Sequence, residues 1–190
     1  SPTFTMHTVD SATRYEHVGA ADMDDDGDTD LVGHTDAWGE VRWFENDGSE
    51  GFTEHVAATQ LYTVGDLRIS DVDGDGWPEA LVATDDALLL LRNDGSGGFS
   101  QSTLHDEYTD YREIRAADFS GDGLPELLVT SFDSRAVVFL ERRGHGYASG
   151  DVDDGLPSAL GLSVGDFDGD LDADIIAASL QNGDILLYDM

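Results

Sequence analysis

The chain of 190 residues carries 41 Asp and Glu against nine basic residues, all of them Arg, which gives a formal net charge of −32. Nucleic acids and anionic membrane surfaces are bound through basic patches, so this charge disfavours both as partners. No apolar run approaches the roughly 20 residues needed to cross a bilayer, which argues against membrane insertion.

An acidic composition can indicate disorder, but 39% hydrophobic residues in regular short runs favour a folded core. We expect a single domain over residues 1–190. Carboxylates that bind no metal ion would form a hydrated, negatively charged surface. Because the screening length falls to roughly 3 Å at about 1 M salt, their self-repulsion would largely disappear there. We therefore also expect a source that lives in concentrated salt.

The first predicted element is a strand at residues 3–9, "TFTMHTV", and one pattern of strands then repeats four times. Each repeat has a short strand, an acidic loop, a second apolar strand and a third strand; three repeats add a fourth strand after a turn. No segment shows the helical periodicity of ten or more residues. The predicted strands are 17–21, 30–34, 40–45 and 51–56; 66–70, 79–83, 87–92 and 98–103; 113–117, 126–130, 136–141 and 146–151; and 161–165, 174–178 and 184–189.

The acidic loops set the period of the repeat. They begin at Asp22, Asp71, Asp118 and Asp166, which are separated by 49, 47 and 48 residues. A period of this length with four strands is typical of a β-propeller blade. The predicted fold is all-β, a β-propeller with four blades of four antiparallel strands. The blades lie at about 15–57, 63–104, 111–150 and 158–190.

The last repeat has no fourth strand of its own. The segment 3–9 resembles "GFTEHVA" at 51–57, a fourth strand of another repeat. We therefore expect it to complete the last blade and close a monomeric four-bladed ring. The alternative is that these residues form half of a larger ring, or one partner of a two-chain ring.

The loops share the pattern D-x-D-x-D-G-x-x-[DE]. Oxygen ligands at positions 1, 3 and 5, a backbone carbonyl at position 7 and an acid at position 9 suit Ca²⁺, which takes six to eight oxygens. An EF-hand would need a Glu at position 12 and flanking helices, and a merely acidic surface turn would not recur four times in register. About four Ca²⁺ ions, one per blade, are expected. The predicted ligands are Asp22, Asp24, Asp26, Asp28 and Asp30; Asp71, Asp73, Asp75, Trp77 and Glu79; Asp118, Ser120, Asp122, Leu124 and Glu126; and Asp166, Asp168, Asp170, Asp172 and Asp174.

The four loops match the shared pattern to different degrees. The second is the most regular, whereas the third has Ser120 at position 3 and should be the weakest because it lacks one charge. The fourth has Leu171 where the pattern expects Gly. If that position needs a positive φ, Leu171 carries roughly 1 kcal/mol of strain.

These loops, together with turns such as "NDGSGGF", resemble FG-GAP/VCBS repeats, the blades of integrin α-subunit propellers and of many microbial surface proteins. The resemblance covers nearly the whole chain and implies Ca²⁺ in the loop between the first two strands of each blade. The usual ring of that family has seven blades. Its members serve in adhesion, glycan binding and scaffolding, and some acidic propellers cleave polysaccharides, so the resemblance does not settle function.

No catalytic residue is predicted, and we expect a protein that is not an enzyme. The stretch "GLSVG" at 161–165 fits G-x-S-x-G but leads into an acidic loop, and no His follows Ser163. The six His residues show no paired spacing typical of a metal site. A polysaccharide lyase is the least favoured alternative.

Loops at the end of the blades opposite the acidic loops carry side chains suited to a protein or glycan ligand. Packing between blades is the competing explanation for the aromatic ones. We expect a binding or adhesion module at the cell surface or outside the cell, with a part in a surface or virion assembly as the alternative, and a dimer as the alternative to a monomer. The candidates are Trp38, Tyr62, Tyr108, Tyr111 and Arg135.

Overall fold

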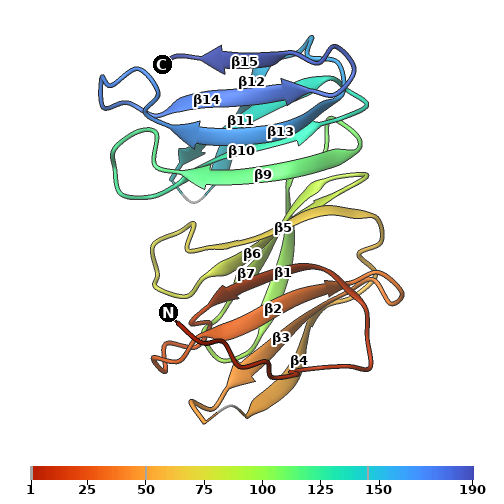
Figure 1. The fold of residues 1–190 in the computed structure, drawn as a ribbon. Coiled ribbons are helices and arrows are strands. Elements are labelled where there is room, and N and C mark those ends of the chain that lie inside the picture. The colour runs from red at the N-terminus through yellow and green to blue at the C-terminus, as the bar shows by residue number, and fades with distance from the viewer. Residues whose placement is uncertain (1, 50, 145) are drawn as a thin grey trace.

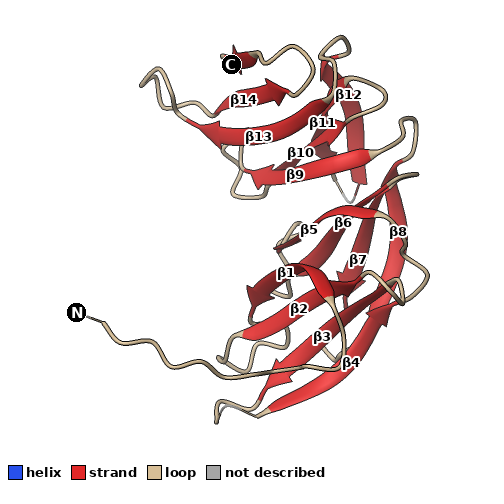
Figure 2. Cartoon of the chain, turned by 45° about the vertical axis from the view of Figure 1, so that its right-hand side comes forward, coloured by secondary structure: helices blue, strands red, loops and turns tan. Residues whose placement is uncertain are grey.

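The computed structural model describes residues 2–49, 51–144 and 146–190 and is entirely β in that part of the chain (Figures 1 and 2). Its strands form four antiparallel sheets, each from consecutive strands in chain order, and the described residues include no helix that could span a membrane. The strands of the first two sheets are β1 (Tyr15–Ala21), β2 (Asp30–Thr35), β3 (Glu40–Asn46) and β4 (Phe52–Ala58), then β5 (Val64–Ser70), β6 (Glu79–Thr84), β7 (Leu88–Asn93) and β8 (Phe99–His105). Those of the last two are β9 (Tyr111–Ala117), β10 (Glu126–Ser131), β11 (Ala136–Arg143) and β12 (Gly146–Asp153), then β13 (Ala159–Gly165), β14 (Asp174–Ser179) and β15 (Ile185–Tyr188).

Burial differs between the strands of one sheet. Every residue of β6 and of β10 is buried, because sheets pack against both faces of these strands. The fourth strands β4 and β8 lie at the outer edge and leave several residues exposed. The burial of a strand therefore reflects its position within the sheet.

Three hydrophobic cores lie between successive sheets. The first joins Val32 and Trp43 to Leu67, the second includes Leu81 and Ile114, and the third buries residues of the last two sheets. No sheet could bury both faces alone, so each repeat is stabilised by its neighbours.

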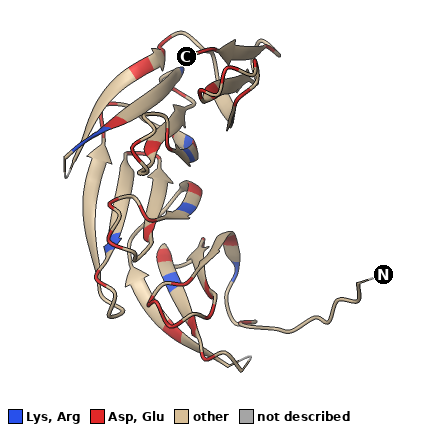
Figure 3. Cartoon of the chain, turned by 90° about the vertical axis from the view of Figure 1, so that its left-hand side faces the viewer, with Lys and Arg blue, Asp and Glu red and all other residues tan. Residues whose placement is uncertain are grey.

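The sheets follow one another in chain order along an open curve, with the first and last at opposite ends (Figures 1 and 3). First strands contact first strands across each junction, β1 with β5, β5 with β9 and β9 with β13. The rotation from sheet to sheet, repeated over three junctions, leaves the fourth sheet far from the first. The described residues thus form an all-β repeat array and not a closed four-bladed ring.

The prediction that residues 3–9 complete the last blade is wrong in this structure. Residues 2–14 form no strand, and the fourth sheet has three strands with β15 at its edge. The N-terminal segment runs beside the first sheet, where the Tyr15 hydroxyl donates to Asp10 Oδ2 at 3.0 Å and Arg42 donates to Thr13 Oγ1 at 3.3 Å. The edge of β15 is out of reach because it lies at the other end of the curve.

Candidate metal sites

Each acidic loop joins the first strand of a sheet to the second, and Figure 3 shows acidic residues along these loops. The first Asp of the loop organises the turn. Asp71 accepts hydrogen bonds from the backbone N–H groups of Gly74 at 2.7 Å and Gly76 at 3.1 Å. Asp118 does the same with Gly121 and Gly123, at 2.7 and 2.9 Å. The position-1 carboxylate therefore holds the turn in shape before any ion binds.

Position 6 requires a positive φ in all four loops. The angle is 93° at Gly27, 95° at Gly76, 90° at Gly123 and 81° at Leu171. The expectation that Leu171 adopts a strained conformation is confirmed. Its side chain is 89% exposed, so no burial offsets the strain.

The acid at position 9 is buried in every loop and is anchored in the same way. Its carboxylate accepts the backbone N–H of the position-2 residue, which is hydrophobic in all four loops. These bonds are Met23 to Asp30 at 2.8 Å, Val72 to Glu79 at 3.0 Å, Phe119 to Glu126 at 2.9 Å and Phe167 to Asp174 at 2.8 Å.

Two carboxylate oxygens in these loops are buried without a hydrogen-bond partner, Asp24 Oδ1 and Glu79 Oε1. Burying a charged acceptor without a partner is costly. A hard cation between the acids would satisfy both oxygens, so the residues fit the ion that the sequence predicted.

The structure brings acids from three of the four loops into groups whose oxygens lie within 4.8 Å of one another. Such oxygen-only groups suit a hard cation such as Ca²⁺. A further group in the fourth loop joins Asp168 and Asp170 to Asp189 from outside the loop. The three main groups are Asp22, Asp24 and Asp30; Asp71, Asp73 and Glu79; and Asp166, Asp168 and Asp174.

The third loop forms no such group among the described residues. Ser120 replaces the position-3 acid, and Glu126 Oε2 accepts the N–H groups of both Phe119 and Ser120, at 2.9 and 3.1 Å. This loop closes largely through its own hydrogen bonds.

Burial changes the protonation of the acids that point inward. It raises the pKa of Glu79 to about 7, with the charges of Asp75 and Asp71 adding to the effect. Burial also raises the pKa of Asp24, and the neighbouring Asp26 and Asp30 raise it further. A bound cation would reverse both shifts, because it favours the ionised form.

Sequence reasoning missed a position on the third strand that faces the loop. The residue after the position-9 acid pairs with a third-strand residue in every sheet, as in Ala80 with Leu91 and Ile175 with Tyr188. The next residue along the third strand then lies beside the loop. Counting strand register from the position-9 acid would have found this position. Its occupants are Glu45, Arg92, Glu141 and Asp189.

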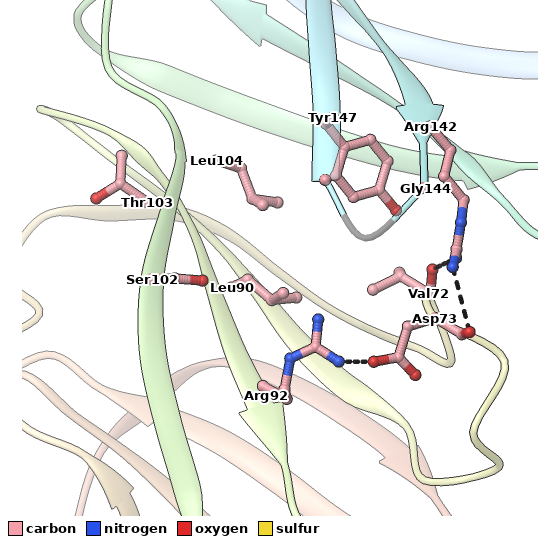
Figure 4. Close-up of a pocket in the computed structure, with 11 residues that line it drawn as sticks. Val72, Asp73, Leu90, Arg92, Ser102, Thr103, Leu104, Arg142, Gly144 and Tyr147 are labelled. Carbon is pink, nitrogen blue, oxygen red and sulfur yellow. Dashed lines mark hydrogen bonds and ion pairs between the residues drawn. The ribbon is translucent and has the colours of Figure 1, made fainter.

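The loops of the first two sheets are also held by the sheet that follows. Asn93 Nδ2 donates to the carbonyl oxygen of Met23 at 2.7 Å, and the equivalent Arg142 donates to the carbonyl oxygen of Val72. Beside the second loop lies a cavity of about 220 Å³, lined by residues that include Arg92, Arg142 and Tyr147 (Figure 4).

The predicted ligand-binding residues separate in the structure. Trp38 and Tyr62 are each 60% exposed and lie on adjacent loops, where Leu61 N–H donates to the Gly39 carbonyl oxygen at 2.8 Å. Arg135 is also exposed, on the turn between β10 and β11.

The two tyrosines of the third repeat lie deeper. Tyr111 is fully buried, and its hydroxyl lies 2.5 Å from His105 Nδ1, which makes it a core residue in this structure. Tyr108 is half-buried and packs against the second core, and its hydroxyl donates to Asp151 at 3.0 Å. Of the predicted ligand-binding residues, Trp38, Tyr62 and Arg135 are exposed in this structure.

Stacked sheets of three or four strands, with acidic loops between their first two strands, define the class of protein, an all-β repeat protein with candidate metal loops. The profile of the FG-GAP-like repeat matches residues 22–82, 71–129 and 118–177, each match running from one acidic loop into the second strand of the next repeat. The chain belongs to the FG-GAP-like repeat family, which confirms the resemblance read from the sequence.

Among solved structures, the chain is similar to a lectin of Agrocybe aegerita described as recognising non-reducing terminal N-acetylglucosamine. The TM-score is 0.64 at 20% identity, over 88% of this chain and 48% of that one. The chain therefore spans about half the length of the lectin. It is also similar to a Photorhabdus luminescens Tc holotoxin pore, with TM-score 0.51 and 20% identity over 90% of this chain and 9% of that one. These likenesses show the fold alone, and no curated protein matches the sequence.

Proposed function

We propose that this protein is a Ca²⁺-stabilised, non-enzymatic binding module that works at the cell surface or outside the cell. The observation that carries the proposal is the pair of buried, unpartnered oxygens, Asp24 Oδ1 and Glu79 Oε1, each within a group of acids. Ca²⁺ outside cells is abundant enough for extracellular modules to work at affinities near 10⁻⁴–10⁻³ M. FG-GAP repeats are typical of extracellular and surface proteins, which supports this location.

Heat denaturation with Ca²⁺, with Mg²⁺ and with EDTA tests the proposal, alongside calorimetric titration of metal-free protein. We expect Ca²⁺ to bind at more than one site and to raise the melting temperature well beyond the effect of Mg²⁺. Mg²⁺ retains its water and demands tighter octahedral geometry, so it suits these loops less well. Melting curves that coincide in all three buffers, with no heat of binding, would reject structural Ca²⁺.

The proposed ligand is a glycan or a protein that contacts the end of the sheets opposite the acidic loops. Trp38 and Tyr62 are exposed there on adjacent loops, and such aromatic side chains dominate many binding surfaces. The similar lectin recognises N-acetylglucosamine termini, so glycans of that class are the first probes. Binding to a glycan array that is lost in Trp38→Ala and Tyr62→Ala would support this face. Binding unchanged in both variants would place the ligand elsewhere.

We further propose that the four sheets are a segment of a larger ring, completed by further chain or by a second copy. The open curve of the sheets and the coverage of about half of the lectin support this. The free edge of β15 supports it as well, because Ile185 and Leu187 are 74% and 52% exposed there. Light scattering distinguishes a monomer from a two-chain ring.

A role in a surface or virion assembly is a second candidate function, favoured by the same exposed edge. A partner strand that pairs with β15 would bury Ile185 and Leu187. If assembly is the function, Leu187→Lys should reduce association without changing glycan binding. Association unaffected by this change would remove β15 from the interface.

The net charge of −32 supports a high-salt environment for the protein. Self-repulsion among the acids would be screened there, so stability should rise with KCl concentration even in EDTA. A melting temperature that is independent of KCl would contradict this part of the proposal.

A further inference from the structure

The second loop differs from the others at the third-strand position that faces the acids. Strand register makes Glu45, Arg92, Glu141 and Asp189 equivalent, so three sheets carry an acid at this position and one carries an arginine. Among them, only Arg92 brings a positive charge to its loop.

The structure shows that this position acts on the loop beside it. Asp189 lies close enough to Asp168 and Asp170 to form a possible ligand group with them. Arg92 instead forms an ion pair with Asp73, through its Nη1 and the carboxylate Oδ2 (Figure 4).

The ion pair uses a carboxylate that belongs to the candidate metal group. Asp73 groups with Asp71 and Glu79, and its side chain is only 14% exposed. Arg142 adds a second cation nearby and donates to the carbonyl oxygens of Val72 and Asp73 (Figure 4). A guanidinium is always charged, so Arg92 places a permanent positive charge beside Asp73.

We propose that Arg92 is a built-in competitor of Ca²⁺ at the second loop, so that residues 71–79 bind the ion more weakly than residues 22–30 and 166–174. The inference rests on the proposed Ca²⁺ binding and reverses the expectation drawn from the regular motif of this loop. A cation that takes Asp73 as a ligand must break the ion pair and then lie close to a positive guanidinium. In the first and fourth loops the equivalent side chain is a carboxylate, which attracts the ion.

The second loop can be observed separately because it alone has a Trp at position 7. The equivalent residues are Asp28, Leu124 and Asp172, so Tb³⁺ in the second loop should be sensitised by excitation of Trp77. Tb³⁺ is a hard cation that takes oxygen ligands as Ca²⁺ does. The loss of the signal in Trp77→Phe assigns it to this loop, and competition with Ca²⁺ then reports the affinity of this loop for Ca²⁺.

The test compares wild type with Arg92→Leu and Arg92→Glu, the second of which restores the acid of the other repeats. We expect both variants to tighten Ca²⁺ binding at the second loop by at least about tenfold, with Arg92→Glu the tighter. Arg143→Leu is the matched control. It removes an arginine that is 67% exposed and paired with Glu141, and it should change the affinity less than about twofold.

The reciprocal variant Glu45→Arg keeps the inference testable if the Arg92 variants fold poorly. Calorimetry of Glu45→Arg should then show one fewer tight Ca²⁺ site, the one in the first loop. The Tb³⁺ luminescence sensitised by Trp77 in the second loop should not change. An unchanged Ca²⁺ affinity of the second loop in both Arg92 variants, with ions still bound at the other loops, would overturn this inference and leave the proposed function intact. An absence of bound ions from wild type and from every variant would overturn both.

Discussion

The second and third acidic loops belong to successive repeats and share one turn geometry. They differ in the groups that contact their carboxylates. In residues 71–79, Glu79 Oε1 is buried without a partner and Asp73 is paired with an arginine from the third strand. In residues 118–126, Ser120 removes one acid, and one oxygen of Glu126 accepts two backbone N–H groups. The comparison shows that one sequence motif can build a loop with a buried, unpartnered carboxylate oxygen and a loop whose closing acid accepts a second backbone N–H group.

The largest expected effect is that of removing Ca²⁺, which should act on the second loop and not on the third. EDTA in low salt should lower the melting temperature by on the order of 10 °C, since each site that is filled well above its dissociation constant adds a few kcal/mol. Hydrogen exchange provides the comparison between loops. Amides of 71–79 should lose protection in EDTA, while those of 118–126 should change little. An equal loss of amide protection in both loops would contradict the expected difference in their dependence on Ca²⁺.

The next largest effect on stability is expected from substitutions at position 3 of the loops. Asp73→Ala should cost about 1–3 kcal/mol of unfolding free energy in Ca²⁺, because it removes a ligand and leaves Arg92 without its partner. Ser120→Ala should cost less than about 1 kcal/mol, since no described hydrogen bond depends on its hydroxyl. Urea titrations in Ca²⁺ measure both. A larger loss for Ser120→Ala would reverse the ranking of the loops.

Glu79 gives the metal-free protein a stability that depends on pH. Its folded pKa of about 7 lies above the reference value of 4.5, so the folded state holds the proton more tightly than the unfolded state. Stability in EDTA should therefore fall as the pH rises from about 4.5 to 7, by on the order of 1–3 kcal/mol. Glu79→Gln should flatten this slope, which pH-dependent urea titrations in EDTA would measure. A slope that persists in Glu79→Gln would assign it to other groups.

The smallest effect concerns position 6, where the fourth loop departs from the second and third. Leu171→Gly relieves a φ of 81° without losing buried surface, so it should stabilise the protein by at most about 1 kcal/mol. The opposite change, Gly76→Leu, introduces strain at a φ of 95° and should destabilise it by a similar amount. Chemical denaturation of both variants measures the pair. Changes of the same sign in the unfolding free energy of both variants would show that φ at position 6 does not determine the effect.

Much of the fold could be predicted from the sequence, because the signals are local and repeated. Strand boundaries follow from short apolar runs between turns, as the predicted strands 79–83 and 126–130 match β6 and β10. The acidic turns were recognisable because each needs a position-1 Asp, a residue with positive φ at position 6 and a buried acid at position 9. Even the strain at Leu171 was visible, since the other three loops have Gly there.

Other features depend on contacts between segments far apart in the chain, and only the tertiary structure decided them. Register between the second and third strands places Arg92 beside Asp73, and packing between sheets buries Tyr111 while leaving Trp38 and Tyr62 exposed. The rotation between sheets keeps residues 3–9 away from β15 and leaves the curve open. Local sequence specifies the repeated unit, because its turns and strands are set by neighbouring residues. How the units stack, and which charges thereby meet, is set by packing geometry between sheets, which the sequence pattern does not encode locally.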